Sequence, residues 1–184
     1  MAQLRFTTAR DLFEAFETAR EDIRVEPADV PSLQFLNSLV AAGDLQNAVG
    51  FCAYLLPRRE AVWWVCQSVR FIGRRISETD EAHLQAAEAW VNEPEEERRL
   101  TALDRGTEGD KTSPATWAAL AAGWSGGAMV RNEHNAAPSP PHATPKAVIA
   151  AILLSTASMQ REVRDRHLAN CVQSAIRLAS ANAP

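Results

Sequence analysis

Several kinds of residue are scarce in this 184-residue sequence, and each scarcity excludes a class of protein. The three cysteines, Cys52, Cys66 and Cys171, are too few and too widely spaced for a disulfide framework or a zinc site. We expect them to be buried, reduced thiols of a cytoplasmic protein. The longest nearly apolar run, 147–154, is too short to span a bilayer, and the N-terminal residues do not resemble a signal peptide. Insertion into a membrane is therefore not expected.

Positive charge is also in short supply. The chain has 19 lysine and arginine residues against 23 acidic residues, which gives a formal net charge of -4. Because a nucleic-acid-binding domain normally carries a basic face, we expect no nucleic-acid partner. The four histidines, His83, His134, His142 and His167, lack the spacing of metal ligands, and no phosphate-binding glycine motif is present. The sequence therefore predicts neither a metal nor a cofactor.

The apolar residues that are present recur with helical spacing between glycine and proline stops. With one tyrosine and few β-branched runs, the chain has little material for a sheet. The pattern predicts an all-α fold of about eight helical segments, whose expected starts are Thr8, Pro31, Asp44, Pro57, Ser77, Pro94, Ser113 and Pro145. Because the connections are short, we expect antiparallel pairs in a single helical domain, 1–184, of compact or solenoid-like form.

Two of the expected segments are less regular than the others. The segment that begins at Pro94 has only Leu100 and Leu103 as large apolar residues, so we expect it to lie at the periphery. The last helical region, from Pro145 to about Ala181, could form one long helix or two helices with a break between them.

The helical pattern is lost between residues 126 and 145. Pro138, Pro140, Pro141 and Pro145 predict a stiff, extended, proline-rich loop that precedes the C-terminal helical region. A structureless loop of more than about 12–15 residues is uncommon inside a compact domain. The loop is therefore expected to be a belt across the surface, a partner-binding segment, or a partly disordered connection.

Two adjacent tryptophans, Trp63 and Trp64, lie in the segment that begins at Pro57. Neighbouring positions on a helix are about 100° apart, so both rings cannot occupy one narrow stripe. We expect one ring to pack inward and the other to contact a second helix or a partner. Arg58 and Arg59 precede them at a helix N-terminus, where the helix dipole disfavours positive charge. They are expected either to form an internal salt bridge or to bind an acidic partner.

The candidate partner-binding residues share large apolar or cationic side chains, or a place in the proline-rich loop. They are Arg58, Arg59, Trp63, Trp64, Trp117, Trp124, Pro138, Pro140 and Pro141. Tryptophan and arginine are frequent in the energetic centres of protein interfaces. Exposed tryptophans would serve a homo-oligomer as well as a complex with another protein.

One short motif suggests catalysis. Residues 123–127 match the G-x-S-x-G pattern of a nucleophile elbow, with Ser125 as nucleophile and His142 or His167 as a possible base. An elbow needs a strand before the serine and a helix after it, but here an alanine-rich helical stretch precedes and a proline-rich stretch follows. The glycines favour a helix C-terminus instead. We expect no enzyme, and a hydrolase centred on Ser125 is the less favoured alternative.

Several elements recur in a fixed order: Phe35-Leu36, Gly43-Asp44, the LPRREAVWW run at 56–64, Ala89-Trp90-Val91 and the run at 124–127. From about residue 30 onward this order resembles an uncharacterised family of small helical bacterial proteins that are often encoded near type VI secretion genes. The resemblance implies a cytoplasmic adaptor or chaperone that binds a type VI secretion component or effector. The alternative is an immunity or regulatory protein whose acidic surface binds a basic toxin.

Overall fold

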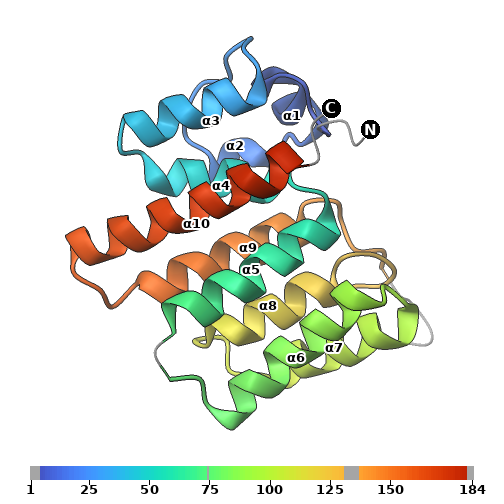
Figure 1. The fold of residues 1–184 in the computed structure, drawn as a ribbon. Helices are drawn as coiled ribbons and strands as arrows, with labels where there is room; N and C mark the ends of the chain where they lie inside the picture. The colour runs from blue at the N-terminus through green and yellow to red at the C-terminus, as the bar shows by residue number, and fades with distance from the viewer. Residues whose placement is uncertain (1–4, 74, 131–136, 182–184) are drawn as a thin grey trace. The chain divides into compact units, whose positions relative to one another are not determined.

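The computed structural model describes residues 5–73, 75–130 and 137–181, and ten α-helices lie within these ranges (Figure 1). The helices are α1 (Ala9–Ala15), α2 (Ala19–Asp22), α3 (Ser32–Ala41), α4 (Leu45–Leu55), α5 (Arg58–Ile72), α6 (Glu78–Asn92), α7 (Glu96–Glu108), α8 (Pro114–Gly123), α9 (Ala143–Thr156) and α10 (Arg161–Ala181). The described residues contain two isolated β-bridges and no strand. The prediction of an all-α fold is confirmed. None of the described helices is both long and apolar enough to cross a membrane.

Two of the expected helical segments are each divided in two, which accounts for the larger number of helices. The first segment ends at Phe16, where α1 stops, and resumes as the short helix α2. The last region breaks after Thr156. There the Ser155 hydroxyl donates to the Ala151 carbonyl at 2.8 Å and the Thr156 hydroxyl to the Leu153 carbonyl at 3.1 Å. Such bonds from side chain to backbone compete with continuation of a helix.

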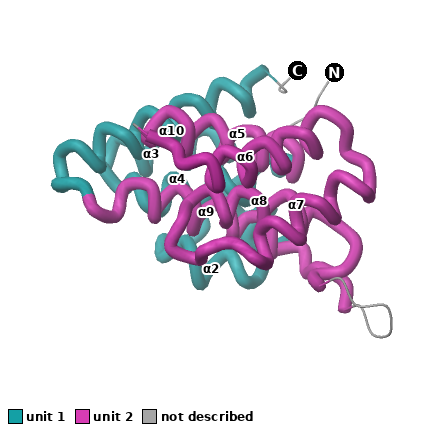
Figure 2. The backbone as a smooth tube through the Cα atoms, turned by 90° about the horizontal axis from the view of Figure 1, so that it is seen from below, with its two compact units in different colours: residues 1–57, 159–184 teal, residues 58–158 magenta. Residues whose placement is uncertain are grey.

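The helices form two compact units, shown in different colours in Figure 2. The terminal unit comprises residues 1–57 and 159–184, and the central unit comprises residues 58–158. The terminal unit is built from α1 to α4 and α10, and the central unit from α5 to α9. Each unit therefore draws its core from its own set of helices.

Aromatic rings fill the core of the terminal unit. Phe35 packs against Phe51 with ring centroids 4.9 Å apart, and Phe13 lies 6.4 Å from each of them. The Tyr54 hydroxyl donates to the Asp22 carboxylate at 2.6 Å, which ties α4 to α2. The three cysteines are buried thiols outside any disulfide, and burial raises the pKa of the Cys52 thiol far above its ordinary value.

The central unit is organised around α8, a helix of ten residues that is apolar on nearly every side. Successive helices from α5 to α9 run in opposite directions (Figure 1), and α8 packs against α6, α7 and α9. A helix that buries its whole circumference belongs at the centre of a core. This arrangement places the C-terminal end of α8, and the loop that follows it, beside α7.

Helix α7 is peripheral, as expected, in that only one of its faces is buried, and small residues bring that face close to α8. A Cβ atom added at Gly106 would lie 2.7 Å from the Cγ of Leu120, and one added at Gly123 would lie 2.6 Å from the Cα of Leu103. Both distances are well inside van der Waals contact. The shortage of large apolar residues in α7 therefore reflects close approach of two backbones.

Candidate functional site

The two described parts of the loop between α8 and α9, residues 124–130 and 137–142, pair with each other. The Met129 amide donates to the Ala137 carbonyl at 3.0 Å, and the Ser139 amide donates to the Gly127 carbonyl at 2.8 Å. These bonds surround a bridge between Ala128 and Pro138. The expectation of an extended loop over 126–145 is therefore corrected in its described parts, and Pro145 belongs to the first turn of α9. We call residues 124–130 and 137–142 the closed loop.

Pro138 is compatible with this pairing because its neighbours supply the hydrogen-bonding groups. Proline has no backbone N–H to donate, but the carbonyl of Ala137 and the amide of Ser139 face Met129 and Gly127. Pro138 therefore lies within the paired part of the closed loop, and Pro140 and Pro141 follow it.

Arg99 of α7 holds the beginning of the closed loop. Its side chain is 4% exposed, and its Nη1 donates to the carbonyls of Gly123, at 2.5 Å, and Ala128, at 3.2 Å. Its Nε and Nη2 bind both carboxylate oxygens of Glu96, at 2.7 and 2.6 Å. A buried guanidinium is tolerated when its donors find acceptors. The same contact holds the pKa of the Glu96 carboxyl below its ordinary value.

Gly127 gives the loop room for Arg99. Its φ is +58°, in the left-handed region that favours glycine, and an added Cβ would lie 2.7 Å from Arg99 Nη2. Gly126, its neighbour, has an ordinary φ and open space around its Cα. Only the second of the two glycines is therefore required by the geometry.

Three further side chains bind the backbone of the closed loop. Arg58 Nη1 donates to the Ser125 carbonyl at 2.7 Å, and the Ser139 hydroxyl donates to the Trp124 carbonyl at 2.7 Å. The indole N–H of Trp124 donates to the Met129 carbonyl at 3.2 Å. Together with Arg99, these contacts satisfy carbonyls that the end of α8 leaves without helical partners.

The two arginines at the start of α5 bind backbone carbonyls, whereas the sequence suggested carboxylates. Arg58 reaches the chain just beyond α8. Arg59 donates through Nε to the Val91 carbonyl at 2.6 Å and through Nη2 to the Asn92 carbonyl at 3.2 Å, at the end of α6. Helix C-termini attract positive charge, which compensates for the position of both residues at the N-terminus of α5.

The tryptophans divide between core and surface. Trp64 is 1% exposed and belongs to the core, whereas Trp63 is 39% exposed, so the expected inward and outward pair is confirmed. Trp117 and Trp124 pack edge to face with ring centroids 6.3 Å apart, and both are half-buried. The Trp117 indole donates to the Lys111 carbonyl at 2.8 Å. Of the sequence candidates, Arg58, Trp117, Trp124, Pro138, Pro140 and Pro141 are therefore brought to the closed loop or its base.

Ser125 occupies a helix end. Its hydroxyl is buried and donates to the Ala122 carbonyl at 2.6 Å, three residues earlier. The helix α8 precedes it, where a nucleophile elbow would have a strand. The interpretation of 123–127 as a helix C-terminus is confirmed by the end of α8 at Gly123, and Gly127 has a left-handed φ in the loop just beyond it.

The sequence reasoning missed Arg99 and Ser139. Arg99 follows Glu95, Glu96 and Glu97 in the sequence, an order that suits the helix dipole and by itself indicates no contact with a loop. A signal was present, because Arg99 shares a helical stripe with Leu103 and Gly106, four and seven residues later, and this stripe faces α8. No comparable signal marks Ser139, since its contact depends on closure of the loop.

A family model described as "Family of unknown function (DUF6931)" matches residues 35–179 of this chain. The match runs from α3 to α10 and includes the closed loop and Arg99. No curated protein matches the sequence. No solved structure matches it either.

Proposed function

The chain belongs to this family of unknown function, and we propose that it is a non-catalytic protein-interaction module that binds a partner protein through the closed loop. The observation that carries the proposal is the buried side chain of Arg99, which binds the Gly123 carbonyl at the end of α8 and the Ala128 carbonyl in the surface connection that follows. Removal of a guanidinium from water costs several kcal/mol before its contacts compensate. A loop that only joins two helices needs no such support.

A loop fixed in this way is suited to binding. Ordering a loop at an interface opposes association, and a loop that is already ordered avoids much of that cost. Binding residues are often found on loops that a rigid scaffold positions. The helices α7 and α8, whose backbones approach closely at Gly106 and Gly123, are the scaffold in this case.

The closed loop also presents apolar groups to solvent. Val130 is 56% exposed, and Pro138 and Pro141 are exposed as well. Proline contributes apolar surface at a low entropic cost, because its φ is already fixed. The exposed apolar side chains and the restricted prolines of the closed loop favour a protein partner whose surface has an apolar recess.

The partner that we propose is a type VI secretion component or effector, for which this protein would serve as a cytoplasmic adaptor or chaperone. The support is the resemblance of the sequence elements described above, and in particular the LPRREAVWW run at 56–64. Arg58, in that run, binds the Ser125 carbonyl of the closed loop. Arg58 occupies the variable position of the LPxREAVWW element, so this contact is separate from the resemblance.

The test is a pull-down from the native bacterium at native protein levels, with identification by mass spectrometry. Val130→Asp places a charge on the exposed loop, and Val163→Asp, at a valine of α10 that is 39% exposed, is the matched control. We expect wild type and Val163→Asp to capture the same secretion protein and Val130→Asp to lose it, with equal thermal melting for all three. Capture that is undiminished in Val130→Asp, or no capture by wild type, would overturn the proposal.

A further inference from the structure

A buried histidine lies against the C-terminal end of α7, outside the candidate site. His83 of α6 is 3% exposed, and each of its two ring nitrogens faces a backbone carbonyl. Nδ1 is 2.6 Å from the oxygen of Thr79, one turn earlier in α6, and Nε2 is 3.0 Å from the oxygen of Arg105 in α7. A carbonyl oxygen only accepts hydrogen bonds, so each contact is satisfied only when the ring nitrogen carries a proton.

The two contacts together require the charged form of the ring. A neutral imidazole has one N–H, and its other nitrogen presents a lone pair, whereas the imidazolium has an N–H on each nitrogen. Arg105 belongs to the last turn of α7, which is the negative end of the helix dipole and favours a positive charge. The geometry therefore fits a ring that carries both protons.

A third group offers the neutral ring another partner. Thr116, in the first turn of α8, is fully buried, and its hydroxyl has no hydrogen-bond partner among the described residues. A Cβ atom added at Gly109 would lie 2.6 Å from both the Thr116 hydroxyl oxygen and His83 Nε2, so these two atoms border the same small space. A hydroxyl can donate to a ring nitrogen only when that nitrogen carries no proton.

We propose that His83 is a pH-dependent switch between the end of α7 and the start of α8. With both protons, the ring donates to the Arg105 carbonyl and joins α6 to α7. When Nε2 loses its proton to water, it becomes an acceptor, releases the Arg105 carbonyl and accepts the Thr116 hydroxyl. Histidine is the side chain whose charge ordinarily changes between pH 5 and pH 8.

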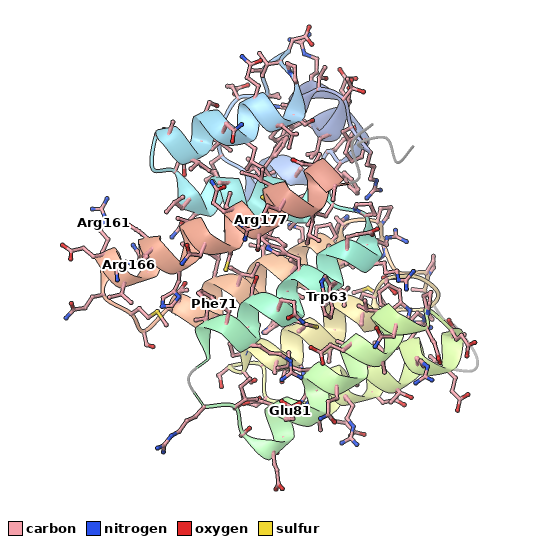
Figure 3. All side chains as sticks on the ribbon, in the orientation of Figure 1. Trp63, Phe71, Glu81, Arg161, Arg166 and Arg177 are labelled. Carbon is pink, nitrogen blue, oxygen red and sulfur yellow. The ribbon has the colours of Figure 1, made fainter. Side chains whose placement is uncertain are left out.

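The other charged groups around His83 keep their charge over that range, since carboxylates, lysine and arginine ordinarily titrate outside it. Helix α8 has no charged residue. Arg70 of α5 binds Glu81, which Figure 3 labels, and Glu88. The remaining charged side chains lie in the first turn of α6, the last two turns of α7 and the turn that follows: Glu78, Asp80, Asp104, Arg105, Glu108, Asp110 and Lys111.

The turn after α7 connects this switch to the closed loop. Lys111 donates to the Gly109 carbonyl at 2.8 Å, and its own carbonyl accepts the Trp117 indole N–H. Trp117 packs on Trp124, the first residue of the closed loop. A displaced end of α7 is therefore expected to alter the base of the closed loop. The switch itself does not rest on the proposed function, because its groups lie at the opposite end of α7 from Arg99.

The test is the proton occupancy of the two His83 ring nitrogens, measured by proton–nitrogen NMR on the full chain from pH 5 to pH 8. In wild type we expect both nitrogens to carry protons at pH 5 and Nε2 to lose its proton as the pH rises. Thr116→Val keeps the size of the side chain but removes the hydroxyl that the neutral ring accepts. The pH at which Nε2 loses its proton is therefore expected to rise by on the order of one unit.

The matched control is Thr101→Val, at an exposed threonine of α7 whose hydroxyl donates to the Glu97 carbonyl. It is expected to leave the titration of His83 unchanged, and circular dichroism checks that both variants are folded. A wild-type ring that holds the same number of protons from pH 5 to pH 8 would overturn the proposal, whether or not the variants fold. An unchanged titration in folded Thr116→Val would also overturn it, since the hydroxyl would then not be the second partner.

Discussion

Two arginines of the central unit are held in contrasting ways. Arg70 keeps 28% of its side chain exposed and binds two carboxylates, those of Glu81 and Glu88. Arg99 is 4% exposed and binds one carboxylate, that of Glu96, together with two backbone carbonyls. The first joins α5 and α6, which already pack together. The second fixes a loop that lies outside any helix.

The contrast shows that the contribution of an arginine to stability depends on its exposure to solvent. When an exposed ion pair is removed, water replaces the lost contacts, and such pairs add little to stability. When a buried donor is removed, its acceptors are left in the interior without a partner. We therefore expect Arg99 to determine both the stability of the central unit and the shape of the closed loop, and Arg70 to contribute modestly to stability.

The largest effect is expected from Arg99→Met, which keeps an unbranched apolar side chain but removes the donors to Gly123 and Ala128. We expect unfolding in urea, followed by tryptophan fluorescence, to show a loss of about 2–4 kcal/mol. Arg98→Met is the matched control. Arg98 is 42% exposed and pairs with exposed Glu93, so its loss should cost less than about 1 kcal/mol. Equal losses of stability in Arg99→Met and Arg98→Met would show that burial of the guanidinium does not determine how much an arginine stabilises the protein.

The next effect tests the space that the loop leaves for Arg99. Gly127→Ala adds a Cβ 2.7 Å from Arg99 Nη2 at a φ of +58°, and we expect it to destabilise the protein by about 1–3 kcal/mol. Gly126→Ala adds a Cβ in open space and should change the stability by less than about 0.5 kcal/mol. Thermal melting of the two variants side by side gives the comparison. A difference too small to measure would mean that the loop moves away from Arg99 without cost.

A smaller effect is expected at Arg70, the half-buried arginine. Arg70→Gln removes the contacts to Glu81 and Glu88 but leaves both carboxylates in reach of water. We expect a loss of about 1 kcal/mol in the same urea experiment. A loss as large as that of Arg99→Met would contradict the distinction between the two arginines.

The smallest effect concerns pH. Arg70 holds the pKa of the Glu81 carboxyl below its ordinary value of 4.5, chiefly by hydrogen bonding to the charged form. A carboxyl with a lowered pKa in the folded state contributes stability that is present above pH 4.5 and is lost as the pH falls through the folded-state pKa. Arg70→Gln should therefore reduce the acid-dependent loss of stability, measured as melting temperature against pH. An unchanged acid profile would show that Glu81 is not stabilised by Arg70.

Local chemistry allowed many of the helix boundaries to be predicted from the sequence. Thr8, an expected helix start, forms a capping box with Asp11, with bonds of 3.2 and 2.8 Å. Ser77 caps α6 by accepting the Asp80 amide at 3.0 Å, as its position suggested. The angular offset of Trp63 and Trp64 also predicted that the two rings would not share one stripe of the helix, and Trp64 is buried whereas Trp63 is 39% exposed. These features depend on residues a few positions apart, so the sequence displays them directly.

Features that depend on contacts between residues far apart in the chain could not be predicted from the sequence in this way. The close packing of one face of α7 against α8 depends on Gly106 and Gly123, which lack side chains and so leave no hydrophobic signal in the sequence. Closure of the proline-rich loop depends on Arg99, twenty-four residues before Gly123. The sequence predicted that Arg58 would find a compensating partner but suggested a carboxylate, because backbone carbonyls at a helix end have no sequence signature.

The central claim is that Arg99 fixes the closed loop, and the most direct measurement is amide hydrogen exchange of Met129 and Ser139, whose N–H groups close the loop. The rates in wild type are compared with those in Arg99→Met, with buried Ala87 of α6 as a reference within the same unit. We expect slow exchange at both loop amides in wild type and an increase of at least about tenfold in the variant, with little change at Ala87. Loop amides that exchange equally fast in the two proteins would contradict the claim.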